Sequence, residues 1–209
     1  MSVQTHNEKL VPAPEGAIIL FDGKDLSGWT HANGSPALWT LVDGTMEVKV
    51  GSGDIQTKQH LGDFELRIEF WLPLMADKTS QARANSGVFL QGLYEIQVLD
   101  SYQNETYPKG ECGAIYGVKS PDVNAAKPPE QWQTYDVTFR AARFGAEGRK
   151  AENAKVTVLW NGVKIHDNVE IEKPTAGGKE EGKPGPLRLQ DHGNKIRYRN
   201  IWIVPKDVK

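Results

Sequence analysis

Short stretches of alternating apolar and polar residues, separated by turn-forming residues, recur along most of the chain. The clearest stretch covers residues 64–72, FELRIEFWL, in which every second side chain is apolar and the intervening ones are mainly charged. The 21 glycines and 12 prolines are spread throughout, and no segment keeps a helical period over three turns. This pattern predicts an all-β domain built as a sandwich or a barrel.

Turn signals divide the alternating stretches into further strands. Asp43-Gly44 and Asn161-Gly162 are dipeptides typical of two-residue hairpin turns, so each predicts a β-hairpin. Residues 86–100, SGVFLQGLYEIQVLD, predict two strands broken at Gly92. Near the C-terminus, GPLRLQDHGNKIRYRNIWIV predicts a strand, a polar turn at DHGN and a second strand. The apolar parity of that second strand shifts, which predicts a bulge near Arg199-Asn200.

The chain is long enough for one large domain, and its 38% hydrophobic residues are enough for a substantial core. We interpret residues 1–15 as an extended lead-in and residues 16–209 as a single domain. Two long connections, residues 101–131 and 173–186, are rich in loop-forming residues. Long loops on a compact domain are frequent places for function, although disorder is the simpler alternative.

Charge and cysteine content exclude several classes of protein. A net charge of −2 gives no basic surplus for nucleic acid or an anionic membrane surface, and no apolar run approaches the roughly 20 residues needed to span a bilayer. The single cysteine, Cys112, excludes an intramolecular disulfide. The N-terminus shows no apolar signal-peptide region, so we expect an exported or periplasmic protein if a signal has been removed and a cytoplasmic one otherwise.

Two of the predicted strands carry rows of polar residues that could form a site. If the apolar residues of each strand face the core, Glu95 and Gln97 face outward together, and so do Arg188, Gln190 and, by extension, His192. On one sheet these rows would gather acid, amide, guanidinium and imidazole groups, which suit the hydroxyls of a polyol. The alternative is the ordinary solvated face of an antiparallel sheet.

Two further carboxylates lie beside these rows. Asp100 ends a predicted strand next to the 101–131 connection, where a capping role and a site role are equally reasonable. Asp191 either bonds backbone N–H groups of its turn or orients His192. The chain has none of the sequence motifs of zinc proteases, thiol redox centres, serine hydrolases or nucleotide-binding loops. Glu95, Asp100 and His192 could together ligate a divalent metal of unknown identity, although no local spacing requires one.

Five motifs in order resemble the 3-keto-disaccharide hydrolase family. The resemblance runs from about residue 17 to residue 205 and rests on LFDGKDLSGW, NSGVFLQGLYEIQVLDS, GAIYG, KPPEQWQTYDVTF and GPLRLQDHGNKIRYRNIWI. It implies a concanavalin A-like jelly-roll sandwich of two antiparallel sheets. It also implies a carbohydrate substrate whose C3 hydroxyl has been oxidised to a ketone by a partner oxidoreductase.

A mechanism follows from the chemistry of such a substrate. A C3 ketone acidifies the C2–H bond, so a base can remove that proton, the group at C1 leaves by β-elimination, and water adds afterward. We expect Glu95 or His192 to be the base, and the residues that bind the substrate or its enolate oxygen to be Gln97, Arg188, Gln190, Asp191 and Asp100. Two other functions stay open: a conventional glycosidase acting on an unoxidised glycan, and a non-catalytic carbohydrate-binding domain.

Overall fold

The computed structural model describes residues 10–175 and 180–206, which form two antiparallel β-sheets packed face to face. The expected all-β sandwich is therefore confirmed. Of the lead-in expected over residues 1–15, residues 1–9 lie outside the described part, and residues 10–15 form neither helix nor strand.

The larger sheet has eight strands and a continuous order β13-β12-β9-β6-β15-β4-β3, with β1 also paired to β15. Its strands are β1 (Ile18–Phe21), β3 (Thr40–Val42), β4 (Thr45–Glu47), β6 (Asp63–Trp71), β9 (Trp132–Arg140), β12 (Ala154–Trp160), β13 (Val163–Ile171) and β15 (Arg197–Lys206). Strand β6 contains the alternating stretch that defined the fold class. Its apolar side chains are buried, namely Phe64, Leu66, Ile68 and Phe70.

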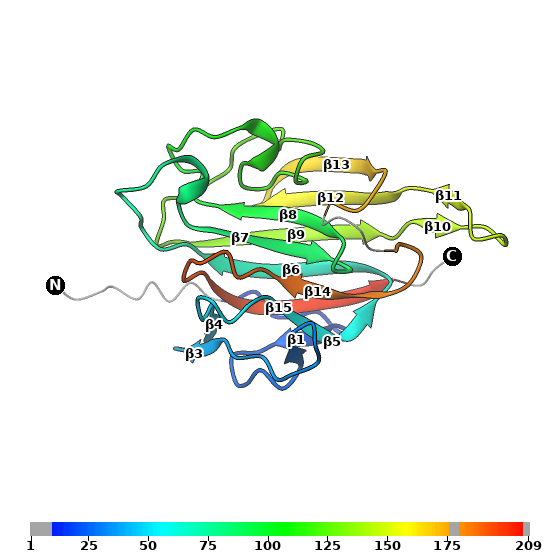
Figure 1. Ribbon diagram of the computed structural model, residues 1–209, viewed down its shortest axis with the longest axis horizontal. Helices are drawn as coiled ribbons and strands as arrows, with labels where there is room; N and C mark the ends of the chain where they lie inside the picture. Colours follow the sequence, from blue (N-terminus) through cyan, green and yellow to red (C-terminus); the bar gives the residue numbers. More distant parts are fainter. Residues whose placement is uncertain (1–9, 176–179, 207–209) are drawn as a thin grey trace.

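The smaller sheet has five strands in the order β2-β5-β14-β7-β8. They are β2 (Trp29–Thr30), β5 (Ile55–Leu61), β14 (Gly185–Leu189), β7 (Asn85–Leu90) and β8 (Tyr94–Leu99). Figure 1 shows β8, β7 and β14 lying over the strands of the larger sheet, while the short pair β10 (Arg143–Phe144) and β11 (Lys150–Glu152) projects beyond both.

Aromatic and branched side chains fill the space between the sheets. Phe139 of β9 contacts Phe64 of its own sheet and Tyr94 of the facing sheet, with ring centroids 5.3 and 5.5 Å apart. Tyr198 of β15 crosses the same space, and its hydroxyl donates to Ser86 Oγ of β7 at 2.7 Å. One face of each sheet is therefore buried in the core, and the opposite face of the smaller sheet is available for polar groups.

The predicted turns are confirmed. Asp43 and Gly44 (φ 49° and 72°) join β3 to β4, and Asn161 and Gly162 (φ 51° and 81°) join β12 to β13. Two consecutive positive φ angles are the signature of the hairpin turns that these dipeptides favour. The break at Gly92 likewise separates the paired strands β7 and β8.

The DHGN segment connects the two sheets. Strand β14 belongs to the smaller sheet and β15 to the larger one, so these consecutive strands do not pair with each other. The register of β15 against β6 shifts between Arg199 and Trp202, and Asn200 there has a φ of 49°. The predicted bulge is thus present, and it lets a single strand keep pairing with β6 on both sides of the irregularity.

The long 101–131 connection packs along the outer edge of β8. Backbone bonds join Gln97 to Gly113 and Ala114, and Tyr116 N donates to Glu95 O at 3.1 Å. This covers the edge of the smaller sheet, which would otherwise expose unpaired N–H and C=O groups. The only helical turns in the described residues are two short 3₁₀ segments, η1 (Ser80–Ala82) and η2 (Pro108–Gly110). Across those residues, none of the helices could cross a bilayer.

Candidate active site

A row of side chains crosses the outer face of the smaller sheet. The strand register places Glu95 of β8 opposite Phe89 of β7, Phe89 opposite Arg188 of β14, and Arg188 opposite Gln56 of β5. Residues directly opposite one another share a face, so these four side chains form one line, which we call the cross-sheet row. Phe89 is buried yet does not belong to the core between the sheets. The two predicted polar strands therefore lie on the same sheet, one strand apart.

Glu95 is the carboxylate at the β8 end of this row. It is only 7% exposed, and its side chain makes no hydrogen bond and no ion pair with any described residue. Burial raises the pKa of Glu95 to about 7, against the opposing positive charge of Arg188 and with the help of the negative charge of Asp54. A carboxyl group with a pKa near 7 can gain or lose a proton at neutral pH, as a general base must.

Gly87 of β7 makes room for this carboxylate. A Cβ atom at Gly87 would lie 2.6 Å from Glu95 Oε1 and 2.7 Å from Phe89 Cε2. The side chain of Glu95 thus lies against the bare backbone of its neighbouring strand. Only glycine fits at this position without displacing the carboxylate or the ring.

Arg188 is held in a fixed position within the row. Its guanidinium carbon lies 3.7 Å from the centroid of the Phe89 ring, and Nη1 donates to Asp54 Oδ2 at 2.6 Å. A weaker bond of 3.4 Å joins Nη2 to Gly92 O, and the buried Nε has no partner among the described residues. Arg188 therefore offers a fixed cation and a free donor to a ligand on this face.

Gln97 belongs to a cluster of amides next to Glu95. Gln97 is 2% exposed, and its Nε2 donates to Gln81 Oε1 and to Gly110 O, both at 3.2 Å. Asn85 Nδ2 also donates to Gln81 Oε1 at 3.2 Å. Within the described chain, Gln97 Oε1 is buried without a partner. A buried acceptor left unpaired costs about 1–3 kcal/mol, which a hydrogen-bond donor of a bound ligand would recover.

The DHGN segment is locked by its aspartate. Asp191 accepts hydrogen bonds at 3.0 Å from the backbone N–H groups of Gly53 and Gly193, and its own N–H donates to Asp54 Oδ1 at 2.9 Å. Of the two roles expected for Asp191, these contacts are those of the turn lock. Strand β14 ends at Leu189, and Gln190 follows it half-buried, its backbone N–H donating to Gly87 O at 3.1 Å.

His192 lies exposed in this turn, beyond the end of β14. Its ring makes no hydrogen bond or ion pair with the described residues. Asp100 has a different environment, since it is buried, bonds to Arg83 Nη1 at 3.2 Å and caps the backbone N–H of Tyr102 at 3.2 Å. Its contacts are those expected of the capping alternative.

A metal-binding group of side chains was also expected from Glu95, Asp100 and His192. In the described part of the chain, no three or more His, Cys, Asp and Glu side chains gather as a metal site requires.

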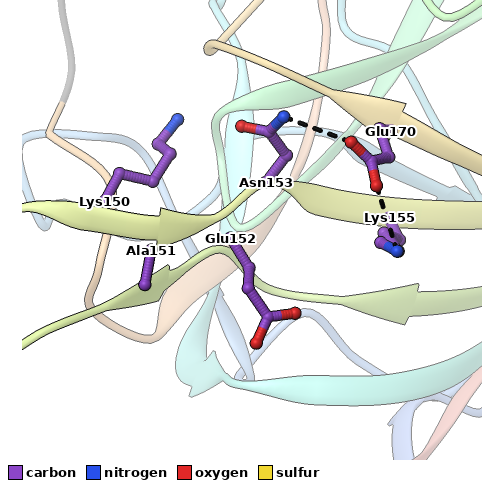
Figure 2. Close-up of a pocket in the computed structure, with 6 residues that line it drawn as sticks. All are labelled: Lys150, Ala151, Glu152, Asn153, Lys155 and Glu170. Atoms are coloured by element: carbon purple, nitrogen blue, oxygen red, sulfur yellow. Dashed lines mark hydrogen bonds and ion pairs between the residues drawn. The ribbon is translucent and has the colours of Figure 1, made fainter.

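One surface hollow lies elsewhere, where β11 meets β12 and β13. It measures about 230 Å³ and is lined by Lys150, Ala151, Glu152, Asn153, Lys155 and Glu170. Figure 2 shows Glu170 between Lys155 and Asn153, which bind it at 3.0 and 3.3 Å. Paired surface charges without an apolar floor are typical of a solvated surface.

Sequence reasoning missed several residues of the site. Alternation in β7 could have placed Phe89 outward, because Val88 and Leu90 belong to the core. Asp54 and Gln81 gave no comparable signal, since they reach the site from segments distant in sequence. Their roles depend on tertiary contacts.

The sequence is similar to that of a known family over most of its length. Residues 16–204 match a family model described as a 3-keto-alpha-glucoside-1,2-lyase-like domain. A protein of Bacteroides thetaiotaomicron named 3-keto-disaccharide hydrolase is 26% identical over 238 residues, which cover 92% of this chain and 79% of that protein.

Solved structures of similar proteins share this fold. A Parabacteroides distasonis protein assigned as a glycosyl hydrolase is 42% identical, with a TM-score of 0.88 over 93% of this chain and 85% of that one. A second protein of that organism, with the same assignment, has a TM-score of 0.66 at 22% identity and covers 92% of this chain and 95% of its own. The second likeness shows a shared fold alone.

Proposed function

The chain belongs to the family of 3-keto-α-glucoside-1,2-lyase-like domains, and from this premise we propose that it cleaves glycosides whose C3 hydroxyl has been oxidised to a ketone. The substrate would be a 3-keto-disaccharide or a related 3-keto-glycoside. An oxidoreductase that converts the C3 hydroxyl to a ketone would have to supply it. The fold and family of the chain are those of carbohydrate-processing hydrolases.

One observation carries the proposal. Glu95 is buried on the outer face of the smaller sheet, its side chain makes no hydrogen bond or ion pair with a described residue, and its pKa is raised to about 7. An ordinary glycosidase needs two carboxyl groups about 5–10 Å apart on either side of the scissile bond. Asp54 and Asp100 are each already engaged, by Arg188 and by Arg83. A single free base suits proton abstraction next to a ketone better than it suits direct hydrolysis.

The proposed reaction starts at C2. The carboxylate of Glu95 removes the C2 proton, and the electron pair left behind is delocalised onto the C3 oxygen as an enolate. The enolate then forms the C1–C2 double bond as the C1–O bond breaks, and the leaving oxygen takes a proton. Water adds across the double bond afterward, so the net result is hydrolysis.

In this scheme the positive charge of Arg188 stabilises the enolate. Its guanidinium is fixed by Phe89 and Asp54 before substrate arrives, so no reorganisation is needed when charge develops. Gln97 Oε1 and the side chain of Gln190 would bind sugar hydroxyls, while Asp191 and Asp100 support the site through the backbone. His192 is the alternative base, reaching the site from its exposed turn.

Substrate choice tests the function. The protein is incubated with a 3-keto-glucoside and with its parent glucoside, each with and without a chelator. We expect release of aglycone from the keto form alone, with no effect of the chelator. Release from the parent would indicate a conventional glycosidase, and binding without release would indicate a carbohydrate-binding module. Loss of activity in chelator would assign stabilisation of the enolate to a divalent metal in place of Arg188.

Two variants test the identity of the base. Glu95→Gln keeps the shape of the side chain but removes the base, and we expect activity to fall by about 10²–10⁴-fold. His192→Ala is expected to retain most activity because its exposed ring makes no hydrogen bond or ion pair with the described residues. The reverse result would make His192 the base, and full turnover by both variants would exclude both assignments.

A further inference from the structure

Two tyrosines of the 101–131 connection form a hydroxyl pair. The hydroxyl oxygens of Tyr107 and Tyr116 lie 2.8 Å apart, and the two rings meet edge to face with their centroids 6.4 Å apart. Tyr107 is 47% exposed, while Tyr116 is half-buried. In such a pair one hydroxyl donates to the other, so the acceptor hydroxyl keeps a proton free for a third group.

The pair is fixed to the two polar positions of β8. The backbone N–H of Tyr116 donates to Glu95 O at 3.1 Å. The ring of Tyr107 lies so close over Gly110 that a Cβ there would come within 2.0–2.6 Å of it, and Gly110 O accepts a hydrogen bond from Gln97 Nε2. The hydroxyl pair therefore borders the face that presents Glu95.

Electrostatics keep the proton on Tyr107. Burial raises the pKa of Tyr107 to about 12, and the Tyr116 hydroxyl and the negative charge of Glu95 act in the same direction. Tyr107 thus stays protonated throughout the range in which Glu95 ionises. A base that is ionised near pH 7 beside an acid that keeps its proton is the arrangement that an elimination requires.

The reaction proposed above leaves one role unfilled, which is the acid that protonates the departing oxygen. Resting on that proposed function, we propose that Tyr107 is this acid and that Tyr116 supports it. As the C1–O bond breaks, the Tyr107 hydroxyl gives its proton to the leaving oxygen, and Tyr116 donates its own hydrogen bond to the resulting phenolate. Solvent then returns a proton to Tyr107, which its exposure permits.

The basicity of a sugar or alkyl alkoxide makes this assistance necessary. Such an oxygen departs poorly as an anion and needs a proton, whereas 4-nitrophenolate is stable enough to leave without one. The contribution of the acid should therefore depend on the leaving group, and the contribution of Glu95 should not. This difference separates a catalytic tyrosine from one that only shapes the site.

The test compares Tyr107→Phe and Tyr116→Phe with wild type on methyl and 4-nitrophenyl 3-keto-glucosides. Tyr102→Phe is the matched control, because it lies in the same connection and its hydroxyl bonds to no described residue. We expect Tyr107→Phe to lose about 10²-fold or more on the methyl substrate and at most a few-fold on the nitrophenyl substrate. Tyr116→Phe should lose less, with the same dependence on the leaving group.

A second measurement isolates the step. In heavy water, Tyr107→Phe should still exchange the C2 proton of the methyl substrate for deuterium, since Glu95 forms the enolate while the next step is slow. Equal losses on the two substrates, or no loss on either, would overturn the assignment of Tyr107. If neither substrate shows a loss, protonated Glu95 would be the acid. Wild-type protein inert toward both keto substrates would overturn the proposed function and this inference together.

Discussion

Glu95, the residue proposed as the catalytic base, is also expected to weaken the fold. A side chain that is 7% exposed and has no described partner is costly to ionise in place, which is why its pKa is raised from 4.5 to about 7. Arg188 is bound to Asp54 and stacked on Phe89, and its positive charge opposes the shift only in part. Ionised Glu95 is therefore expected to lower the stability of the fold.

Glu95→Gln should therefore lower activity and raise stability, in a way that depends on pH. The folded-state pKa is raised, so the stability that the protonated group contributes is fully present below pH 4.5 and is lost as pH rises through about 7. Above that pH the wild type pays about 3 kcal/mol that a glutamine avoids. Urea denaturation at about pH 8.5 should show the variant to be more stable by up to this amount, and at about pH 4 the difference should vanish.

The matched control is Glu105→Gln, at an exposed position of the 101–131 connection. It should show no such dependence on pH. A stability difference for Glu95→Gln that is equal at both pH values would mean that packing, and not ionisation, is responsible.

Strands β7 and β8 form one paired unit. Gly87 of β7 leaves room for a side chain of its neighbour, and β8 carries the polar residues Glu95 and Gln97. Alternation puts Gly87 and Phe89 of β7 opposite Gln97 and Glu95 of β8. The missing side chain at Gly87 accommodates the carboxylate, and the ring of Phe89 supports Arg188. A glycine within a strand weakens it, so its presence here marks a close approach.

Gly87→Ala is expected to separate folding from function. The backbone at Gly87 is not left-handed, so alanine is conformationally acceptable, and its Cβ would displace Glu95 Oε1 and the Phe89 ring. A shift of about 1 Å in a catalytic group costs on the order of 10²-fold in rate. Steady-state assays should show such a loss while circular dichroism shows a native fold. Gly62→Ala, which meets nothing within 4 Å, is the control and should stay active.

At the scale of the whole molecule, a hydrogen-bonded chain links the two sheets to the DHGN crossover. The Tyr198 hydroxyl of β15 donates to Ser86 Oγ of β7 at 2.7 Å, and Ser86 Oγ donates to Gln190 O at 2.6 Å. Both Ser86 and Tyr198 are fully buried in the core. This chain fixes the end of β14 relative to both sheets, at the place where the backbone leaves one for the other.

Ser86→Ala should cost about 1–3 kcal/mol, because it leaves the Tyr198 hydroxyl and the Gln190 carbonyl buried without that partner. Tyr198→Phe removes one of these groups, so the double variant should lose less stability than the two single variants together. Urea denaturation of all four proteins gives the coupling, expected at about 0.5–3 kcal/mol. Additive losses would mean that the two bonds act independently.

By itself, the sequence determined the strands, their turns and the family. These features depend on local signals, namely alternation at a period of two and the dipeptides Asp43-Gly44 and Asn161-Gly162. Local backbone preferences are enough to produce strands and turns from such signals. Parity also determined that Glu95 and Gln97 share a face with each other, as do Arg188 and Gln190. The resemblance to 3-keto-disaccharide hydrolases added the expected sandwich of two sheets.

Only the tertiary structure decided which polar residues meet and which are buried. Parity cannot tell a solvated face from a covered one, and only the structure shows that Glu95 is buried, on a strand whose outer edge is paired with the 101–131 connection. Parity likewise extended the outward row to His192, whereas β14 ends at Leu189 and the chain crosses to the other sheet. Burial and charge pairing depend on contacts between segments far apart in sequence, such as the ion pair of Asp54 with Arg188. Local sequence patterns therefore cannot predict them.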